Sequence, residues 1–181
     1  EEMMQGEVST PGCFLEARDI LRRHFLAYCI DSWTSEESTN TLPSKIRELR
    51  LLNENIFNDD AFVLNKIIVF IKNNKASLRS AFCDQYEEKT QFALQKLFDT
   101  LEDGTFYNKL ISEFSLLSDR LHHLGKELEE FNAQKQRIQS NDPLLKQIEE
   151  LIKATKKQYR QIMDESMIEY MTNVGLLPNY A

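Results

Sequence analysis

The sequence predicts an all-α protein in which an N-terminal helical subdomain carries a long antiparallel coiled-coil hairpin. Two stretches, 105–139 and 142–172, place apolar residues at steps of three and four, which is the pattern of amphipathic helices. Only a short turn separates them, where Asp142 can cap a helix that Pro143 begins. Helices joined so closely fold back antiparallel, and each would run roughly 50 Å. The low content of 5 Gly and 4 Pro in 181 residues also favours long regular elements.

Two helices are expected first in the helical subdomain, which spans residues 1–104. The first covers about 14–33, and the second is opened by Pro43 and runs to about residue 53. A loop rich in Ser, Thr and Glu separates them. The apolar positions that recur at helical spacing are Ile20, Leu21, Phe25, Tyr28 and Cys29 in the first helix, and Ile46, Leu49 and Leu52 in the second.

The third and fourth helices are expected over 61–73 and 76–101. Segment 67–71 is apolar nearly all round, and a buried strand is the competing interpretation. We prefer a helix, because apolar residues extend the pattern on its N-terminal side and no partner strand is evident. Asp59 and Asp60 can cap this helix. The fourth helix is expected to direct four aromatic side chains towards a core: Phe82, Tyr86, Phe92 and Phe98.

The hairpin is expected over residues 105–173, followed by an exit segment, 174–181, that leads into a further domain. Both helices carry the a/d spacing of a coiled-coil seam, with one polar gap at Lys135. Counting outward from the turn, this register would place Leu121 opposite Ile162. The seam residues are Leu110, Phe114, Leu117, Leu121, Leu124, Leu128, Phe131 and Ile138 in the first helix, and Leu145, Ile148, Ile152, Thr155, Tyr159 and Ile162 in the second.

Cysteine usage and the chain ends indicate the cellular setting. Cys13, Cys29 and Cys83 are odd in number and far apart, which argues against a disulfide framework or a zinc site and favours the reducing cytoplasm. No apolar run approaches the length of a membrane span, and no signal-peptide pattern opens the chain, so no membrane partner is expected. Because the chain starts at Glu1, we expect a piece cut from a larger polypeptide.

No constellation for catalysis or metal binding is apparent. The five glycines are isolated, so the glycine cradle of a nucleotide-binding loop is missing. His122 and His123 are adjacent and point about 100° apart on a helix, so they cannot grip one metal ion together. His24 and Cys29 lie five residues apart and face differently, which makes packing their expected role. We therefore expect no catalytic, cofactor-binding or metal-binding residue in this segment.

Charge is unevenly spread along the chain. A net charge of −7 argues against a protein that coats nucleic acid with its whole surface, yet residues 135–160 contain 7 basic and 3 acidic residues. Basic residues at spacings of seven, four and three are expected to form one stripe on the face away from the seam: Lys146, Lys153, Lys157 and Arg160. Such a stripe can follow a phosphate backbone. The alternative is a solvated lysine face, which the lack of interleaved aromatic residues favours.

Two terminal segments resemble parts of large bacterial superfamily-2 DEAD/DEAH-box helicases. They are Thr10-Pro11-Gly12-Cys13-Phe14-Leu15-Glu16-Ala17, continuing through Ile20-Leu21-Arg22-Arg23-His24-Phe25, and Asn173-Val174-Gly175-Leu176-Leu177-Pro178-Asn179-Tyr180-Ala181. In that family such segments flank a helical region that lies after two RecA-like motor lobes and before a C-terminal cysteine-containing domain. The family uses ATP hydrolysis to translocate on or unwind nucleic acid, so the resemblance implies ATP and Mg²⁺ in the parent protein.

The resemblance implies that this chain is a helical accessory domain of an ATP-dependent DNA helicase or translocase. The nucleotide-binding loop, acidic box and arginine finger of the family have no counterpart in these 181 residues, so catalysis would belong to motor lobes of the same polypeptide. The domain would guide nucleic acid, separate strands or dock a partner protein. The alternative is a coiled-coil scaffold or adaptor that binds a protein partner without nucleic acid. An independent enzyme is not expected.

Overall fold

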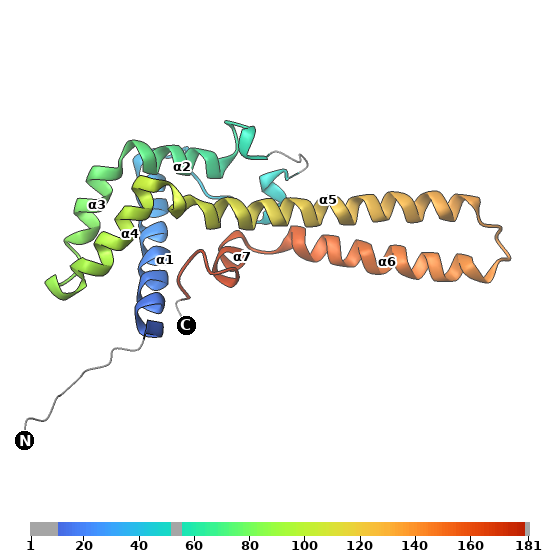
Figure 1. The fold of residues 1–181 in the computed structure, drawn as a ribbon. Helices are drawn as coiled ribbons and strands as arrows, with labels where there is room; N and C mark the ends of the chain where they lie inside the picture. Colours follow the sequence, from blue (N-terminus) through green and yellow to red (C-terminus); the bar gives the residue numbers. More distant parts are fainter. Residues whose placement is uncertain (1–10, 52–55, 180–181) are drawn as a thin grey trace, which may run out of the picture.

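The protein is all-α, as predicted. The computed structural model describes residues 11–51 and 56–179, and no strand occurs in these two ranges. A helical base carries two long helices that project from it side by side (Figure 1). The α-helices are α1 (Pro11–Glu36), α2 (Val63–Asn73), α3 (Lys75–Cys83), α4 (Gln91–Asp103), α5 (Asn108–Arg137), α6 (Pro143–Asp164) and α7 (Met167–Asn173). Short 3₁₀ helices are η1 (Ile46–Leu49), η2 (Ile56–Asn58), η3 (Glu88–Thr90) and η4 (Thr105–Tyr107).

The core of the base is built around α1. The ring of Phe25 is fully buried and lies 5.0, 5.7 and 5.6 Å from the rings of Phe82, Phe98 and Phe106. These edge-on contacts bring α3, α4 and η4 against α1 in the geometry that aromatic pairs prefer. Ile20 was expected on the apolar face but is 53% exposed, so that prediction is wrong. The buried face of α1 therefore covers fewer positions than the apolar residues of its sequence, and Ile20 lies outside that face.

The prediction of a helix over 43–53 is wrong. Among residues 43–51, the described part of this region, only η1 forms, and it ends at Leu49, because the C-cap residue Arg50 has a left-handed φ of 53°. Ile46 and Leu49 are buried, which agrees with their apolar spacing, and Leu52 lies outside the described residues.

A backbone bridge explains why a longer helix does not form there. The N–H of Ile46 donates to the carbonyl of Glu165 at 3.1 Å, and the N–H of Met167 donates to the carbonyl of Ser44 at 3.0 Å. A helix beginning at Pro43 would need the Ser44 carbonyl for its own ladder. The bridge therefore keeps this segment extended and joins it to the end of the hairpin.

The second arm of the hairpin, predicted as one helix over 142–172, is divided by the same bridge. α6 ends at Asp164, and Glu165 and Ser166 are extended. Ser166 then caps α7, because its hydroxyl accepts the N–H of Glu169 at 3.4 Å. The prediction of a continuous helix is wrong because a local pattern cannot reveal a bridge to a segment that lies far away in the chain.

The helical prediction for the apolar run 67–71 is confirmed by α2. Val69 is nevertheless 54% exposed, so the helix is buried on one side only. The predicted caps are wrong: the N-cap residue is Phe62, without a side-chain cap bond. Asp59 instead accepts the N–H of Ala61 at 2.9 Å in the preceding turn. The buried positions of α2 are Leu64, Ile67, Ile68 and Ile71.

The single helix predicted over 76–101 is also wrong, since the chain turns between Cys83 and Gln91. The buried residues of the two halves would lie about 130° apart on one straight helix, so one helix could not pack both sets against α1. Phe92 was expected in the core but is 61% exposed. The buried residues are Leu78 and Phe82 in α3, and Leu94, Leu97, Phe98 and Leu101 in α4.

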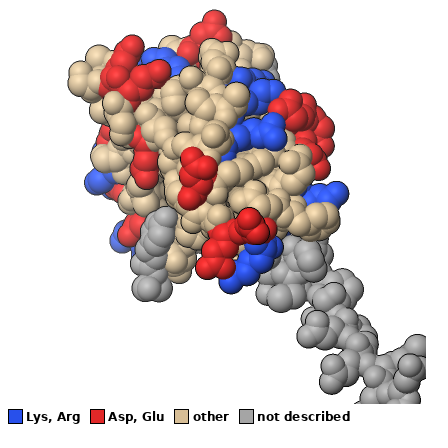
Figure 2. All heavy atoms as spheres, turned by 90° about the vertical axis from the view of Figure 1, so that its left-hand side faces the viewer, with Lys and Arg blue, Asp and Glu red and all other residues tan. Residues whose placement is uncertain are grey.

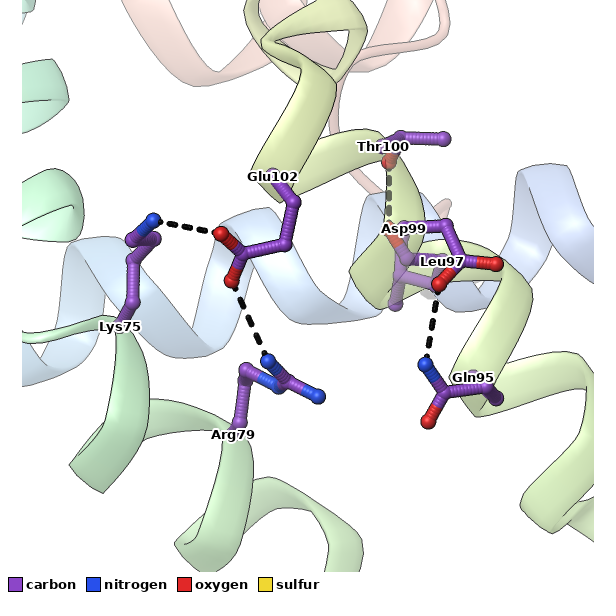
Figure 3. Close-up of polar contacts among 7 residues, drawn as sticks. All are labelled: Lys75, Arg79, Gln95, Leu97, Asp99, Thr100 and Glu102. Atoms are coloured by element: carbon purple, nitrogen blue, oxygen red, sulfur yellow. Dashed lines mark hydrogen bonds and ion pairs between the residues drawn. The ribbon is translucent and has the colours of Figure 1, made fainter.

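Glu102 links α4 back to α3 across this turn (Figure 3). Its carboxylate lies 2.9 Å from Nζ of Lys75 and 3.3 Å from Nη1 of Arg79. The hydrogen bond from Lys75 and the positive charge of Lys75 hold the pKa of Glu102 below its usual value. Because these groups are exposed, they orient the two helices more than they stabilise them.

α5 and α6 run antiparallel and leave the base together (Figure 1). The turn is formed as predicted: Asp142 accepts the N–H of Leu144 at 2.9 Å, and Pro143 takes the first helical position. Across the two helices, Nζ of Lys135 lies 3.1 Å from a carboxylate oxygen of Glu149, one residue from its predicted opposite position. Coiled-coil packing along the whole hairpin stays a prediction.

The segment that follows α7 packs into the base. Leu176 and Leu177 are buried, and the hydroxyl of Tyr170 donates to the carbonyl of Glu113 at 3.0 Å, which joins α7 to α5. At the end of the base opposite the hairpin tip, acidic and basic side chains are interspersed (Figure 2). None of the helices in the described ranges is long and apolar enough to cross a membrane.

Candidate nucleic-acid interface

α6 presents the four predicted basic residues on one exposed face. At 100° per residue they occupy a sector about 60° wide. The buried side of α6, with Ile152, Thr155 and Ile162, is centred roughly 150° away from them. The four residues, all exposed, are Lys146, Lys153, Lys157 and Arg160.

A groove of about 940 Å³ follows the hairpin on this side. Lys153, Lys157 and Arg160 line it, whereas Lys146 does not. Lys156 also lines the groove, and so do two residues of α5, Asn132 and Lys135. The basic surface is therefore formed from both helices, and its residues on α6 lie nearer to the base than the predicted stripe does, because Lys146 is not among them.

Two of these basic residues were missed in the sequence for different reasons. Lys156 lies about 40° around α6 from Arg160, between the stripe and the seam, so a helical projection alone could have found it. Lys135 was assigned to a polar gap in the seam. Its place beside the groove depends on how α5 pairs with α6, which its ion pair with Glu149 reveals.

Two ion pairs mark the ends of the basic surface. Towards the tip, Lys135 pairs with Glu149 at 3.1 Å, and towards the base, Arg47 of η1 contacts Asp164. Between them lie four cations that form no ion pair within the part of the chain that the structure describes. We call these residues the basic row: Lys153, Lys156, Lys157 and Arg160.

The basic row concentrates charge along a short length of helix. Its four positive charges lie within eight residues, and the first and last of these are about 10.5 Å apart along the helix axis. Lys146 stands apart from the row, because Glu149 and Glu150 come between them in the sequence. Its role in binding stays a prediction.

Other reactive groups do not form a chemical site. Among the described residues, no group of three or more His, Cys, Asp or Glu is placed to hold a metal ion. Cys29 is buried, and burial raises the pKa of its thiol, so it is protonated at neutral pH and a poor nucleophile. His123 lies on the exposed side of α5, with Nε2 3.3 Å from Glu127.

No protein-family model, curated protein or solved structure matches this chain. Function is therefore inferred from the charge and shape of the hairpin. The structure also brings the start of the base into contact with the segment that follows α7. Arg22 of α1 donates to the carbonyl of Gly175 at 2.8 Å, across 153 residues of sequence.

Proposed function

We propose that this chain is a non-catalytic helical accessory domain of an ATP-dependent DNA helicase or translocase, and that its hairpin guides the nucleic acid. The observation that carries the proposal is the basic row. Its four cations are exposed and lack ion pairs within the described residues, in a chain whose net charge is −7. Nucleic acid would therefore bind locally and in one orientation.

The spacing of the row suits a phosphate backbone. One strand of duplex DNA carries a phosphate every 3.4 Å of helix axis, so about 10.5 Å of α6 can face roughly three phosphates. Each phosphate that the row neutralises releases counterions, which drives binding. Phosphate contacts position a protein without reading bases, so the hairpin would hold DNA without sequence preference.

The row also carries an energetic cost that binding would relieve. Lys153 and Lys157 are four residues apart, as are Lys156 and Arg160. Like charges at this spacing destabilise a helix by about 0.2–0.5 kcal/mol per pair. An approaching phosphate backbone supplies the missing negative charge.

The accessory role follows from the resemblance of the two ends. ATP and Mg²⁺ would be bound by motor lobes of the same polypeptide, because this chain offers no glycine cradle or acidic box. The contact of Arg22 with Gly175 supports the assignment, since two segments that flank one helical region in the family would be expected to meet in one base. The hairpin would then project from the motor towards the DNA.

The salt dependence of DNA binding tests this proposal. The variant replaces the basic row with glutamine, which keeps helix propensity nearly constant. In titrations of duplex DNA at several salt concentrations, we expect the slope of log affinity against log salt to flatten by about 3 units. The single variant Lys146→Gln measures separately whether that residue adds a further contact, with a change of up to about 0.9.

A matched control removes the same charge from other exposed positions. It replaces three lysines and one arginine with glutamine: Lys45, Lys66, Lys126 and Arg120. The control should keep a slope close to that of the original chain. Equal slopes for the basic-row variant and the control would mean that binding follows net charge alone, and the proposed interface would be rejected.

The alternative function, a scaffold or adaptor for another protein, is favoured by one observation. Leu144 and Leu151 lie seven residues apart on the same side of α6 and are 53% and 46% exposed. If the hairpin binds a protein partner, replacing both leucines with glutamine should impair the parent protein, whereas neutralising the basic row should not. The reverse result would favour nucleic-acid guidance.

A further inference from the structure

A second concentration of positive charge lies in the base, where α1, the start of α5 and the segment that follows α7 meet. A Cβ atom added at Gly175 would lie 3.1 Å from Nζ of Lys109 and 3.3 Å from Nη2 of Arg23. These two nitrogens are therefore at most about 6.4 Å apart, the sum of the two distances. Arg22 approaches the same glycine, since its Nη2 donates to the Gly175 carbonyl at 2.8 Å.

The negative charge beside these cations is too small to balance them. Asp19 forms ion pairs with both Arg22 and Arg23. No ion pair involves Lys109 within the described ranges of the chain. Within the described residues, one carboxylate thus pairs with two of these three cations, whereas the whole chain carries an excess of 7 negative charges. Like charges held this close repel each other unless an anion lies between them.

The arginines are held in place and one of their donors is unused. The side chain of Arg22 is 16% exposed and that of Arg23 is 33% exposed, and Asp19 fixes both. The Nε–H of Arg23 is buried and has no hydrogen-bond acceptor among the described residues. Buried donors without a partner are uncommon in folded proteins, so this group calls for a ligand with acceptor oxygens.

We propose that Arg22, Arg23 and Lys109 form a binding site for a phosphate group. Guanidinium groups suit phosphate because they donate several hydrogen bonds in one plane, and the lysine adds a compact charge. Gly175 lets the side chains of Lys109 and Arg23 approach the backbone closely, because any side chain there would press on them, and its φ of +75° favours glycine. The proposal is independent of the basic row. The phosphate would come from a small phosphate compound or from a nucleic-acid backbone.

Phosphate-specific stabilisation tests this site. Thermal unfolding of the 181-residue chain is followed during titration with inorganic phosphate and pyrophosphate, with sodium chloride at equal ionic strength as the reference. We expect both phosphates to raise the melting temperature above the reference. In Lys109→Gln the apparent affinity should fall by about tenfold, because a charge-assisted hydrogen bond is lost. Without phosphate, this variant should be at least as stable as the original chain, since a like-charge repulsion is removed.

Two further variants make the test specific. Lys126→Gln removes an exposed charge from the same helix and should leave the phosphate response unchanged. Gly175→Ala should weaken the response by crowding Lys109 and Arg23. The proposal is overturned if phosphate and chloride act equally, or if Lys109→Gln responds like the original chain.

A competition experiment between pyrophosphate and an oligonucleotide identifies the source of the phosphate. Pyrophosphate should displace a short single-stranded oligonucleotide if the site accepts backbone phosphates, and Lys109→Gln should weaken that binding even when the basic row is neutralised. Small phosphates that bind without displacing the oligonucleotide would assign the site to a small phosphate compound. Both outcomes support the site, and the absence of any Lys109-dependent binding contradicts it.

Discussion

At the scale of single residues, the partly buried carboxylate of Asp19 pairs with two arginines of the base, Arg22 and Arg23. Burial by itself would raise the pKa of Asp19. The hydrogen bonds and positive charges of Arg22, and then of Arg23, outweigh this effect, so the pKa lies below its ordinary value of 3.8. The ionised form is therefore the one that the folded protein stabilises.

This shift predicts a pH-dependent effect of Asp19→Asn. A carboxyl group whose pKa is lowered by folding contributes stability above its unfolded pKa, and the contribution is lost as the pH falls through the folded pKa. Urea unfolding should show the variant to be less stable than the original chain at pH 7. The difference should shrink once the pH falls below about 4. A difference that stays constant between pH 7 and pH 3 would show that the charge of Asp19 is not responsible.

The basic row shows which parts of a surface site a sequence can predict. Lys153, Lys157 and Arg160 were found because helical spacing alone puts them on one face. The sequence gives no sign that Arg47 pairs with Asp164, since that pair joins η1 to α6 across more than a hundred residues. Such a contact depends on tertiary packing, which no local pattern contains.

At the scale of elements, the hairpin is buried at its base and exposed towards its tip. On α5, Leu110, Leu117 and Leu121 are buried, whereas Phe131 is only half-buried, as is Ile138 just after the helix. The base thus anchors the first half of α5. The outer half depends on its pairing with α6 and on the cap at the turn.

Leu121→Ala tests this anchoring. Leu121 is 4% exposed, so removing its side chain should lower the free energy of unfolding by about 2–4 kcal/mol. The matched control is Leu116→Ala on the same helix, because Leu116 is 63% exposed and its loss should stay within about 0.5 kcal/mol. Denaturant unfolding measures both variants. Similar losses for the two would contradict the burial of α5 against the base.

The elements that were predicted correctly are those whose own residues determine them. α2 and the turn at Asp142 and Pro143 follow from periodicity and capping. The break between α3 and α4 was missed because residues 84–90 contain no glycine or proline, and the turn forms only because both helices pack on α1. The bridge between Ile46 and Glu165 was missed for the same reason: it joins distant segments.

At the scale of the whole molecule, the base and the hairpin are joined at two places. α5 continues directly from the base, and α6 returns to it through the backbone bridge and the contact of Arg47 with Asp164. A load applied at the tip would therefore reach the base through both arms. This arrangement suits the role proposed for the hairpin, in which it would hold nucleic acid at a fixed position relative to a motor.

Lysine footprinting of the unaltered chain tests the central claim, that the basic row contacts DNA. Exposed amines are modified with and without duplex DNA at low salt, and the extent of modification is read by mass spectrometry. We predict that DNA protects Lys153, Lys156 and Lys157, while Lys66 of α2 and Lys126 of α5 are modified as before, since all five are exposed in the free protein. Equal protection of all five lysines, or no protection of the basic row under conditions where DNA is bound, would contradict the account.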